Sequence, residues 1–132
     1  MGELVVVERL SRAVQRDVNH TLGLLLPHVA STDSVLDIGC GEAYVTAGLA
    51  RRARDTWGAD IVDLRRAHVP TFLPYDGVTL DVPDNRFDVV VLSFVLHHVP
   101  NELKPALVGE ARRICRRTLL VIEDTPRTAF DR

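Results

Sequence analysis

The chain has 132 residues, 46% of them hydrophobic, which is enough for one domain with a sizeable buried core. Its formal net charge is only −2, so no strong field favours nucleic acid or an acidic membrane surface. The sequence lacks the pattern of a secretory signal, an apolar run long enough to span a membrane, and enough cysteines for a disulfide framework. We therefore expect a cytoplasmic protein with reduced thiols and with no nucleic-acid or membrane partner.

The first part of the chain has apolar residues at helical spacing, from about residue 4 to about residue 26. This spacing predicts an N-terminal helix within residues 1–28, with Pro27 as its stop. Such a helix could cover a ligand site as a lid, or simply pack against the rest of the domain. After a turn, residues 34–38 form an almost continuous apolar run, which is typical of a strand buried on both faces.

Strands and helices alternate along the rest of the chain. We expect a helix over residues 42–54, strands over 56–60 and 71–75, about one or two helical turns in 61–67, a strand over 87–93, a helix from Pro105 and a strand over 118–123. The alternation predicts an α/β fold with a mostly parallel sheet of about five strands. In such sheets ligands bind beyond the carboxyl ends of the strands, near the point where the strand order reverses.

A glycine-containing turn links the strand at residues 34–38 to the following helix. Its sequence is Asp37-Ile38-Gly39-Cys40-Gly41, with the two glycines one residue apart. Glycine has no Cβ, so the turn can take positive φ and a ligand can lie against the main chain. The start of the helix offers unpaired N–H groups to an anionic or polar ligand group. This turn is the most informative feature of the sequence.

Acidic residues follow four of the predicted strands, at Asp37, Asp60, Asp76 and Glu123. Parallel strands place these positions on one edge of the sheet. Asp60 lies 19 residues after Gly41, a spacing that suits a carboxylate accepting hydrogen bonds from two ribose hydroxyls. Asp76 could meet the amine of a purine, and Ile61 could pack on the face of the base. Acidic residues are also common in turns and at helix starts, so only their order together with the glycine turn favours a ligand role.

Four segments in this order resemble class I S-adenosylmethionine-dependent methyltransferases, in particular the small-molecule group called methyltransferase type 11. They are Asp37-Ile38-Gly39-Cys40-Gly41, Gly58-Ala59-Asp60-Ile61, the run from Val82 to Val91 (VPDNRFDVVV), and Leu96-His97-His98-Val99-Pro100. The match runs from about residue 33 to about residue 124. The resemblance implies a Rossmann-like three-layer sandwich that binds S-adenosylmethionine, as a single domain over residues 1–132 with its cofactor-binding core at 33–124.

The resemblance also implies a role for individual positions. The methionine portion of the cofactor would lie against the glycine turn, at Asp37, Gly39, Cys40 and Gly41. After the next strand, Asp60 would hold the ribose and Ile61 would contact the adenine face. The adenine edge would meet Asp76 and Gly77 after the third strand, and Ser93 at the end of the fourth strand would line the reactive side.

The chain departs from the family pattern in two places. Ala43 stands where the family usually has a third glycine, and we expect this small residue to be tolerated. The sequence ends at Arg132, just past the predicted fifth strand, so it lacks the hairpin that normally follows: either the sequence is a fragment of a longer protein, or the family fold is cut short. Without that hairpin the apolar strand at residues 119–122 would be an open edge, and we expect a homodimer or an aggregation tendency through it.

Methyl transfer to a small-molecule acceptor by in-line displacement is the chemistry that the resemblance implies. The protein then supplies positioning, a dry site and sometimes a base. His97 follows the fourth strand and is the candidate catalytic base. The alternative is that one histidine packs inward and the other caps or faces water. His97 and His98 would point apart in extended backbone, and no Cys-x-x-Cys or His-x-x-x-His pair occurs, so no metal site is expected.

Two other functions remain open from the sequence. A nicotinamide-dependent dehydrogenase shares the fold and the ribose carboxylate, but its Gly-x-Gly-x-x-Gly pattern would need glycine where Tyr44 stands. A non-catalytic module that binds the cofactor or a protein partner would be consistent with the missing strands.

Overall fold

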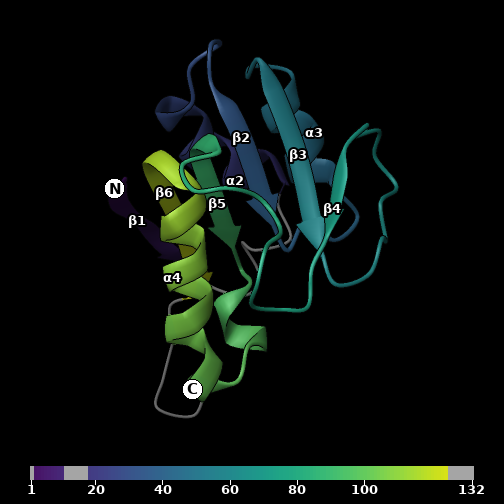
Figure 1. The fold of residues 1–132 in the computed structure, drawn as a ribbon. Coiled ribbons are helices and arrows are strands. Elements are labelled where there is room, and N and C mark those ends of the chain that lie inside the picture. The colour runs from purple at the N-terminus through teal and green to yellow at the C-terminus, as the bar shows by residue number, and fades with distance from the viewer. Residues whose placement is uncertain (1, 11–17, 125–132) are drawn as a thin grey trace.

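The computed structural model describes residues 2–10 and 18–124, and it shows one parallel sheet of six strands in the order β1-β6-β5-β2-β3-β4 (Figure 1). The α/β fold with a parallel sheet is thereby confirmed. The strands are β1 (Glu3–Leu10), β2 (Ser34–Ile38), β3 (Asp55–Asp60), β4 (Phe72–Pro74), β5 (Phe87–Ser93) and β6 (Cys115–Asp124).

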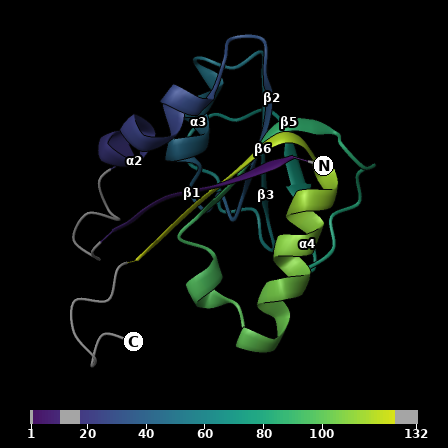
Figure 2. The same ribbon diagram turned by 90° about the vertical axis from the view of Figure 1, so that its left-hand side faces the viewer.

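Helices cover both faces of this sheet. They are α2 (Val18–Leu25), α3 (Tyr44–Ala50) and α4 (Lys104–Ile114), with short 3-10 helices η1 (Leu26–His28), η2 (Leu96–His98) and η3 (Asn101–Leu103). Figure 2 shows α2 and α3 on one side of the sheet and α4 on the other. None of the helices in the described part of the chain is long and apolar enough to cross a membrane.

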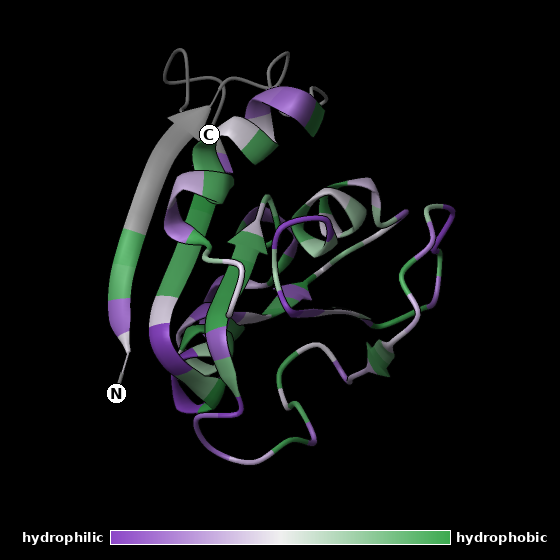
Figure 3. Ribbon diagram, turned by 90° about the horizontal axis from the view of Figure 1, so that it is seen from above, coloured by the Kyte–Doolittle hydropathy of each residue, from purple (hydrophilic) through white to green (hydrophobic). Residues whose placement is uncertain are grey.

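The alternation of side chains along β5 builds the two halves of the core. Val89 and Val91 belong to the cluster that contains Leu49 of α3, whereas Val90 belongs to the cluster that contains Leu107 of α4. All these side chains are fully buried. Figure 3 shows the resulting hydrophobic colour along the central strands. A strand covered on both faces reads as a continuous apolar run, which is why the sequence located β2 and β5 with their observed bounds.

The beginning of the chain differs from the sequence prediction. Residues 3–10 form strand β1 rather than the start of a helix, and α2 is the α-helix described in this region; residues 11–17 lie outside the described residues. The run Leu4-Val5-Val6-Val7 explains the difference, because β-branched side chains favour a strand and short apolar runs carry no clear period.

Strand β1 also overturns the predicted open edge. It pairs in parallel with β6, with Leu4 opposite Leu119 and Val6 opposite Val121. The sheet therefore has six strands instead of about five, and the apolar strand at residues 119–122 is covered by the chain itself. The argument for a homodimer through an exposed fifth strand loses its basis.

The segment between β3 and β4 is a second correction. Residues 61–67 contain no helical turn and form an extended loop instead. Arg65 pairs with Asp63 at 2.8 Å, and the backbone N–H groups of Arg66 and Ala67 donate to the Glu42 carbonyl at 2.9 and 3.0 Å. These contacts hold the loop next to the glycine turn.

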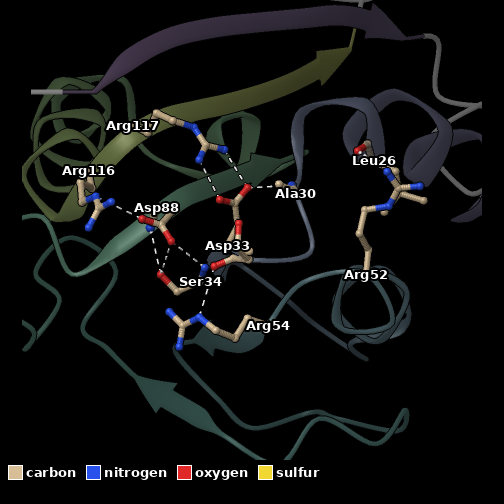
Figure 4. A network of polar contacts seen from close by, with 10 residues as sticks. Leu26, Ala30, Asp33, Ser34, Arg52, Arg54, Asp88, Arg116 and Arg117 are labelled. Carbon is tan, nitrogen blue, oxygen red and sulfur yellow. Dashed lines mark hydrogen bonds and ion pairs between the residues drawn. The ribbon is translucent and has the colours of Figure 1, made fainter.

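A polar network joins the amino ends of three strands (Figure 4). The Asp88 carboxylate accepts hydrogen bonds from the Ser34 N–H at 2.9 Å and from its hydroxyl at 3.2 Å. The Arg117 guanidinium donates two bonds of 2.7 Å to Asp33, which lowers the pKa of that carboxyl below its usual value. These contacts fix β2, β5 and β6 at the end of the sheet opposite to the glycine turn.

Candidate functional site

The strand order reverses between β2 and β5. From β2 the chain proceeds outward through β3 and β4, and then returns to the other side of β2 with β5 and β6. Ligands of such sheets bind beyond the carboxyl ends of the strands at this point. Asp37, Asp60, Ser93 and Glu123 occupy the last or the second-last positions of β2, β3, β5 and β6, so the structure brings them to one edge.

The turn after β2 has left-handed backbone at three positions. Gly39, Gly41 and Ala43 have φ angles of 75°, 53° and 71°. Ala43 takes this conformation without glycine, directly before α3. The N–H groups of Gly39 and Cys40 both donate to the Ala59 carbonyl, at 2.7 and 2.9 Å, and attach the turn to β3.

The two glycines of the turn serve different purposes. A Cβ on Gly39 would clash with the Cγ2 atom of Val95, the residue that follows β5 and Phe94. A Cβ on Gly41 would meet nothing within 4 Å. Gly39 is therefore required by packing within the protein, while Gly41 leaves open space above the turn.

Asp60 links the end of β3 to the same turn. Its Oδ2 accepts a hydrogen bond from the Gly41 N–H at 2.9 Å, and its Oδ1 accepts one from the Ile61 N–H at 2.7 Å. An ionised carboxylate has about four acceptor positions, so each oxygen keeps capacity for another donor. The geometry suits a carboxylate that is held rigidly while it receives two ligand hydroxyls.

Asp37 is a buried carboxyl group with one oxygen left over. Its side chain is 2% exposed, and Oδ2 accepts a hydrogen bond from the Thr46 hydroxyl at 2.7 Å. Oδ1 has no hydrogen-bond partner within residues 2–10 and 18–124. Burial raises the pKa of Asp37 to about 7, and the nearby charge of Asp60 acts in the same direction. A buried acceptor without a partner is costly unless a donor reaches it.

The predicted adenine side is formed where β3 and β4 end. Ile61 is 59% exposed, and a Cβ on Gly77 would lie 3.5 Å from its Cδ1 atom, so the two positions face each other. The Oδ1 atom of Asp76 accepts hydrogen bonds from the N–H groups of Val78 and Thr79 at 2.9 and 2.7 Å, which lower its pKa. The Asp76 carboxylate therefore stabilises the turn at residues 76–79. The sequence prediction gave Asp76 a contact with the adenine edge and did not name these two hydrogen bonds.

Tyr75 is a further candidate residue, next to Asp60, that the sequence prediction missed. It is half-buried, and its N–H donates to the Asp60 carbonyl at 3.2 Å. Burial, followed by the charges of Asp60 and Asp76, raises the pKa of its phenol to about 12. Tyr75 directly follows β4 and directly precedes Asp76, and this position is the signal that could have identified it.

Cys40 lies in the turn with its thiol against Gly58. A Cβ on that glycine would lie 2.9 Å from the Cys40 Sγ atom, so β3 approaches the turn closely only because Gly58 has no side chain. Burial raises the pKa of Cys40 to about 12, and the charges of Asp37 and Asp60 act in the same direction. Cys40 is therefore a neutral thiol.

The end of β5 carries the remaining candidates. Ser93 is half-buried at the last position of the strand. His97 lies in η2, where its Nδ1 atom is 3.1 Å from the Glu123 Oε2 atom. The rings of His97 and His98 lie side by side, with centroids 3.9 Å apart, rather than pointing apart, because the backbone here is a 3-10 helix and not extended.

The comparisons with known proteins agree with this geometry. The family described as "Methyltransferase domain" matches residues 8–131. An uncharacterized methyltransferase of Mycobacterium bovis is 37% identical over 76 residues, covering 52% of this chain and 39% of that protein. A protein of Mycobacterium tuberculosis is named as a probable S-adenosylmethionine-dependent methyltransferase. It is 32% identical over 108 residues, which cover 77% of this chain and 38% of that protein.

A solved structure shows the same fold at lower identity. A SAM dependent methyltransferase from Archaeoglobus fulgidus superposes with a TM-score of 0.67 at 20% identity, over 85% of this chain and 55% of that one. The chain thus spans less than two-fifths of the length of the two curated relatives, at 39% and 38%. Because the family match extends over nearly the whole sequence, the chain belongs to the methyltransferase domain family.

Proposed function

We propose that the protein binds S-adenosylmethionine at the carboxyl edge of its sheet and transfers the methyl group to a small-molecule acceptor. The observation that carries this proposal is the Asp60 carboxylate, held at 2.9 Å from the N–H of Gly41 beside a turn that has open space above it. The family membership and the names of the similar proteins support the same cofactor.

The residues present fit the parts of this cofactor. Asp60 has acceptor capacity for the two ribose hydroxyls, and the exposed Ile61 offers an apolar surface for the adenine. Gly77 lies next to Ile61, where a Cβ would come within 3.5 Å of the Ile61 Cδ1 atom, and it adds no side chain to this side of the site. Asp37 has a buried oxygen that finds no partner among the described residues, which suits the ammonium group of the methionine portion. Gly39, Cys40 and Gly41 supply the main-chain surface between these sites.

The chemistry follows from positioning. The bound cofactor supplies an electrophilic methyl group on a sulfonium sulfur. The chain itself orients the two reactants in line and excludes water, with Ser93 at the end of β5 on the side of the acceptor. The acceptor would approach above the carboxyl ends of β5 and β6.

Calorimetric titration of the full chain tests the proposal. S-adenosylhomocysteine, the demethylated product, is expected to bind with one site per chain, and NAD⁺ is expected not to bind. Failure of S-adenosylhomocysteine to bind would contradict the assignment, and binding of NAD⁺ in its place would favour a dehydrogenase. Labelled methyl groups from S-adenosylmethionine then separate an active enzyme from a module that only binds. A module that binds the cofactor without methyl transfer has a specific basis, since the chain spans only 39% and 38% of the length of the two curated relatives.

A further inference from the structure

Glu123 and His97 form a paired carboxylate and imidazole at the end of the sheet where the acceptor would approach. The Glu123 Oε2 atom lies 3.1 Å from His97 Nδ1, and its Oε1 atom accepts a hydrogen bond of 2.7 Å from the Leu96 N–H. The side chains of His97 and Glu123 are 33% and 16% exposed. One carboxylate therefore holds both the backbone and the ring of the turn η2.

This contact fixes the tautomer of the imidazole. An ionised carboxylate can only accept hydrogen bonds, so Nδ1 of His97 must be the donor in the contact. In the neutral ring the other nitrogen, Nε2, then carries a lone pair and no proton. The arrangement presents Nε2 as a proton acceptor.

The pair is attached to the glycine turn through the segment that carries it. Val95, two residues before His97, packs into the space that Gly39 leaves by having no Cβ. Phe94 has a φ angle of 58° and donates its N–H to the Ile122 carbonyl at 2.8 Å, which ties the same segment to β6. The imidazole thus has a defined position relative to the proposed cofactor site.

We propose that His97 is the general base for a hydroxyl acceptor, of the phenol or enol kind, and that Glu123 is the positioning residue that keeps Nε2 of His97 unprotonated. The proposal rests on the proposed function. A neutral imidazole can accept the proton of such a hydroxyl while the oxygen forms its bond to the methyl carbon. A tertiary amine or a thioether would have no proton to lose and would leave this pair without a role.

In the methyl transfer, the hydroxyl oxygen forms a bond to the methyl carbon while the bond between that carbon and sulfur breaks. The electron pair of the broken carbon–sulfur bond remains on sulfur. The hydroxyl proton passes to Nε2 of His97. The imidazolium that forms is stabilised by the adjacent Glu123 carboxylate and returns its proton to water after product release.

Other titratable groups near the pair need separate controls. His98 lies against His97 with ring centroids 3.9 Å apart, and the backbone of Arg9 in β1 is the register partner of Glu123. A His98→Gln variant tests the first of these groups and serves as the matched control.

The test compares Glu123→Gln, His97→Gln and His98→Gln in the full chain. Glutamine at position 123 can still accept from the Leu96 N–H through its oxygen, but its amide would donate to Nδ1 and move the ring proton to Nε2. We expect nitrogen NMR of His97 to show Nδ1–H in the native chain and Nε2–H in Glu123→Gln. We also expect methyl transfer to a panel of phenols and enols to fall roughly 100-fold or more in both Glu123→Gln and His97→Gln, and less than about 3-fold in His98→Gln.

Calorimetry with S-adenosylhomocysteine separates the two proposals. Unchanged affinity in all three variants, together with the rate losses, supports the base assignment. An Nε2–H tautomer in the native chain, an undiminished rate in Glu123→Gln, or transfer to amines or thiols but to no hydroxyl compound would overturn it. Loss of S-adenosylhomocysteine binding by the native chain would instead contradict the proposed function.

Discussion

The Asp60 carboxylate accepts a hydrogen bond from the Gly41 N–H at 2.9 Å and so joins the end of β3 to the glycine turn after β2. The same carboxylate accepts the Ile61 N–H at 2.7 Å, at the start of the loop that carries the exposed apolar side chains. Asp60 is therefore part of the fold before any ligand arrives. A carboxylate fixed in this way loses little conformational freedom when it binds a ribose.

Replacing Asp60 is expected to weaken cofactor binding. Asp60→Ala would remove the two proposed hydrogen bonds to the ribose, which should cost on the order of 2–3 kcal/mol, or roughly 30- to 150-fold in the dissociation constant of S-adenosylhomocysteine. Asp60→Asn keeps one oxygen for the Gly41 N–H and separates the ribose contact from the structural one. Asp84→Ala is the control. Asp84 precedes β5, away from the carboxyl edge of the sheet, and its replacement removes only an exposed carboxylate that pairs with Arg113 of α4. Equal calorimetric affinities in all these proteins would mean that the ribose lies elsewhere.

The two glycines of the turn are expected to respond differently to alanine. Gly39→Ala would force its methyl group into Val95 and should destabilise the fold by roughly 2 kcal/mol or more, because overpacking and positive φ act together. Gly41→Ala meets open space and should cost only about 1 kcal/mol of folding stability, but its methyl would stand where the cofactor approaches. Urea denaturation and calorimetry should show a stability defect for the first variant and a binding defect for the second. The reverse assignment would contradict the proposed site.

The sequence predicted the buried parts of the fold and the edge of the sheet at which the proposed site residues come together. Ser34–Ile38 and Phe87–Ser93 are apolar without interruption, because both faces of a central parallel strand are covered. Asp60 and Gly41, although 19 residues apart, come together as the resemblance implied, because parallel strands bring their carboxyl ends to one edge. A central parallel strand can thus be recognised from a few consecutive apolar residues, without knowledge of its partners.

The parts that the sequence missed depend on partners far away in the chain. The sequence predicted an open edge at residues 119–122, but nothing within a few residues of that strand shows that residues 3–10 would pair with it. The contact between His97 and Glu123 joins residues 26 positions apart, and Arg117 finds Asp33 across 84 positions. Each residue alone reads as an ordinary polar side chain, so only the assembled sheet could reveal the pairs.

The buried Asp37 is expected to make stability depend on pH. Its pKa is about 7 in the folded chain, above the ordinary value of 3.8, so the folded state binds more protons than the unfolded state between these values. The free energy of unfolding should therefore fall as the pH rises through this range and level off above pH 7. Asp37→Asn removes the contribution, and its stability relative to the native chain should increase by roughly 2–3 kcal/mol between about pH 5 and about pH 8. Urea denaturation at both pH values measures this, and parallel curves for the two proteins would contradict it.

Strand β1 is expected to protect the edge of β6. Val5 packs against the cluster beneath α2 and α3, whereas Leu4, its neighbour on the opposite face, is 40% exposed. Val5→Lys places a charge in the apolar cluster, which should cost on the order of 1–3 kcal/mol and loosen β1 from β6. The freed apolar edge should then pair with other copies, so sedimentation should show self-association that increases with concentration. Leu4→Lys keeps the strand and adds the same charge, and its stability should change by less than about 0.5 kcal/mol with no added association. If both variants sediment alike, the pairing of β1 does not protect the edge.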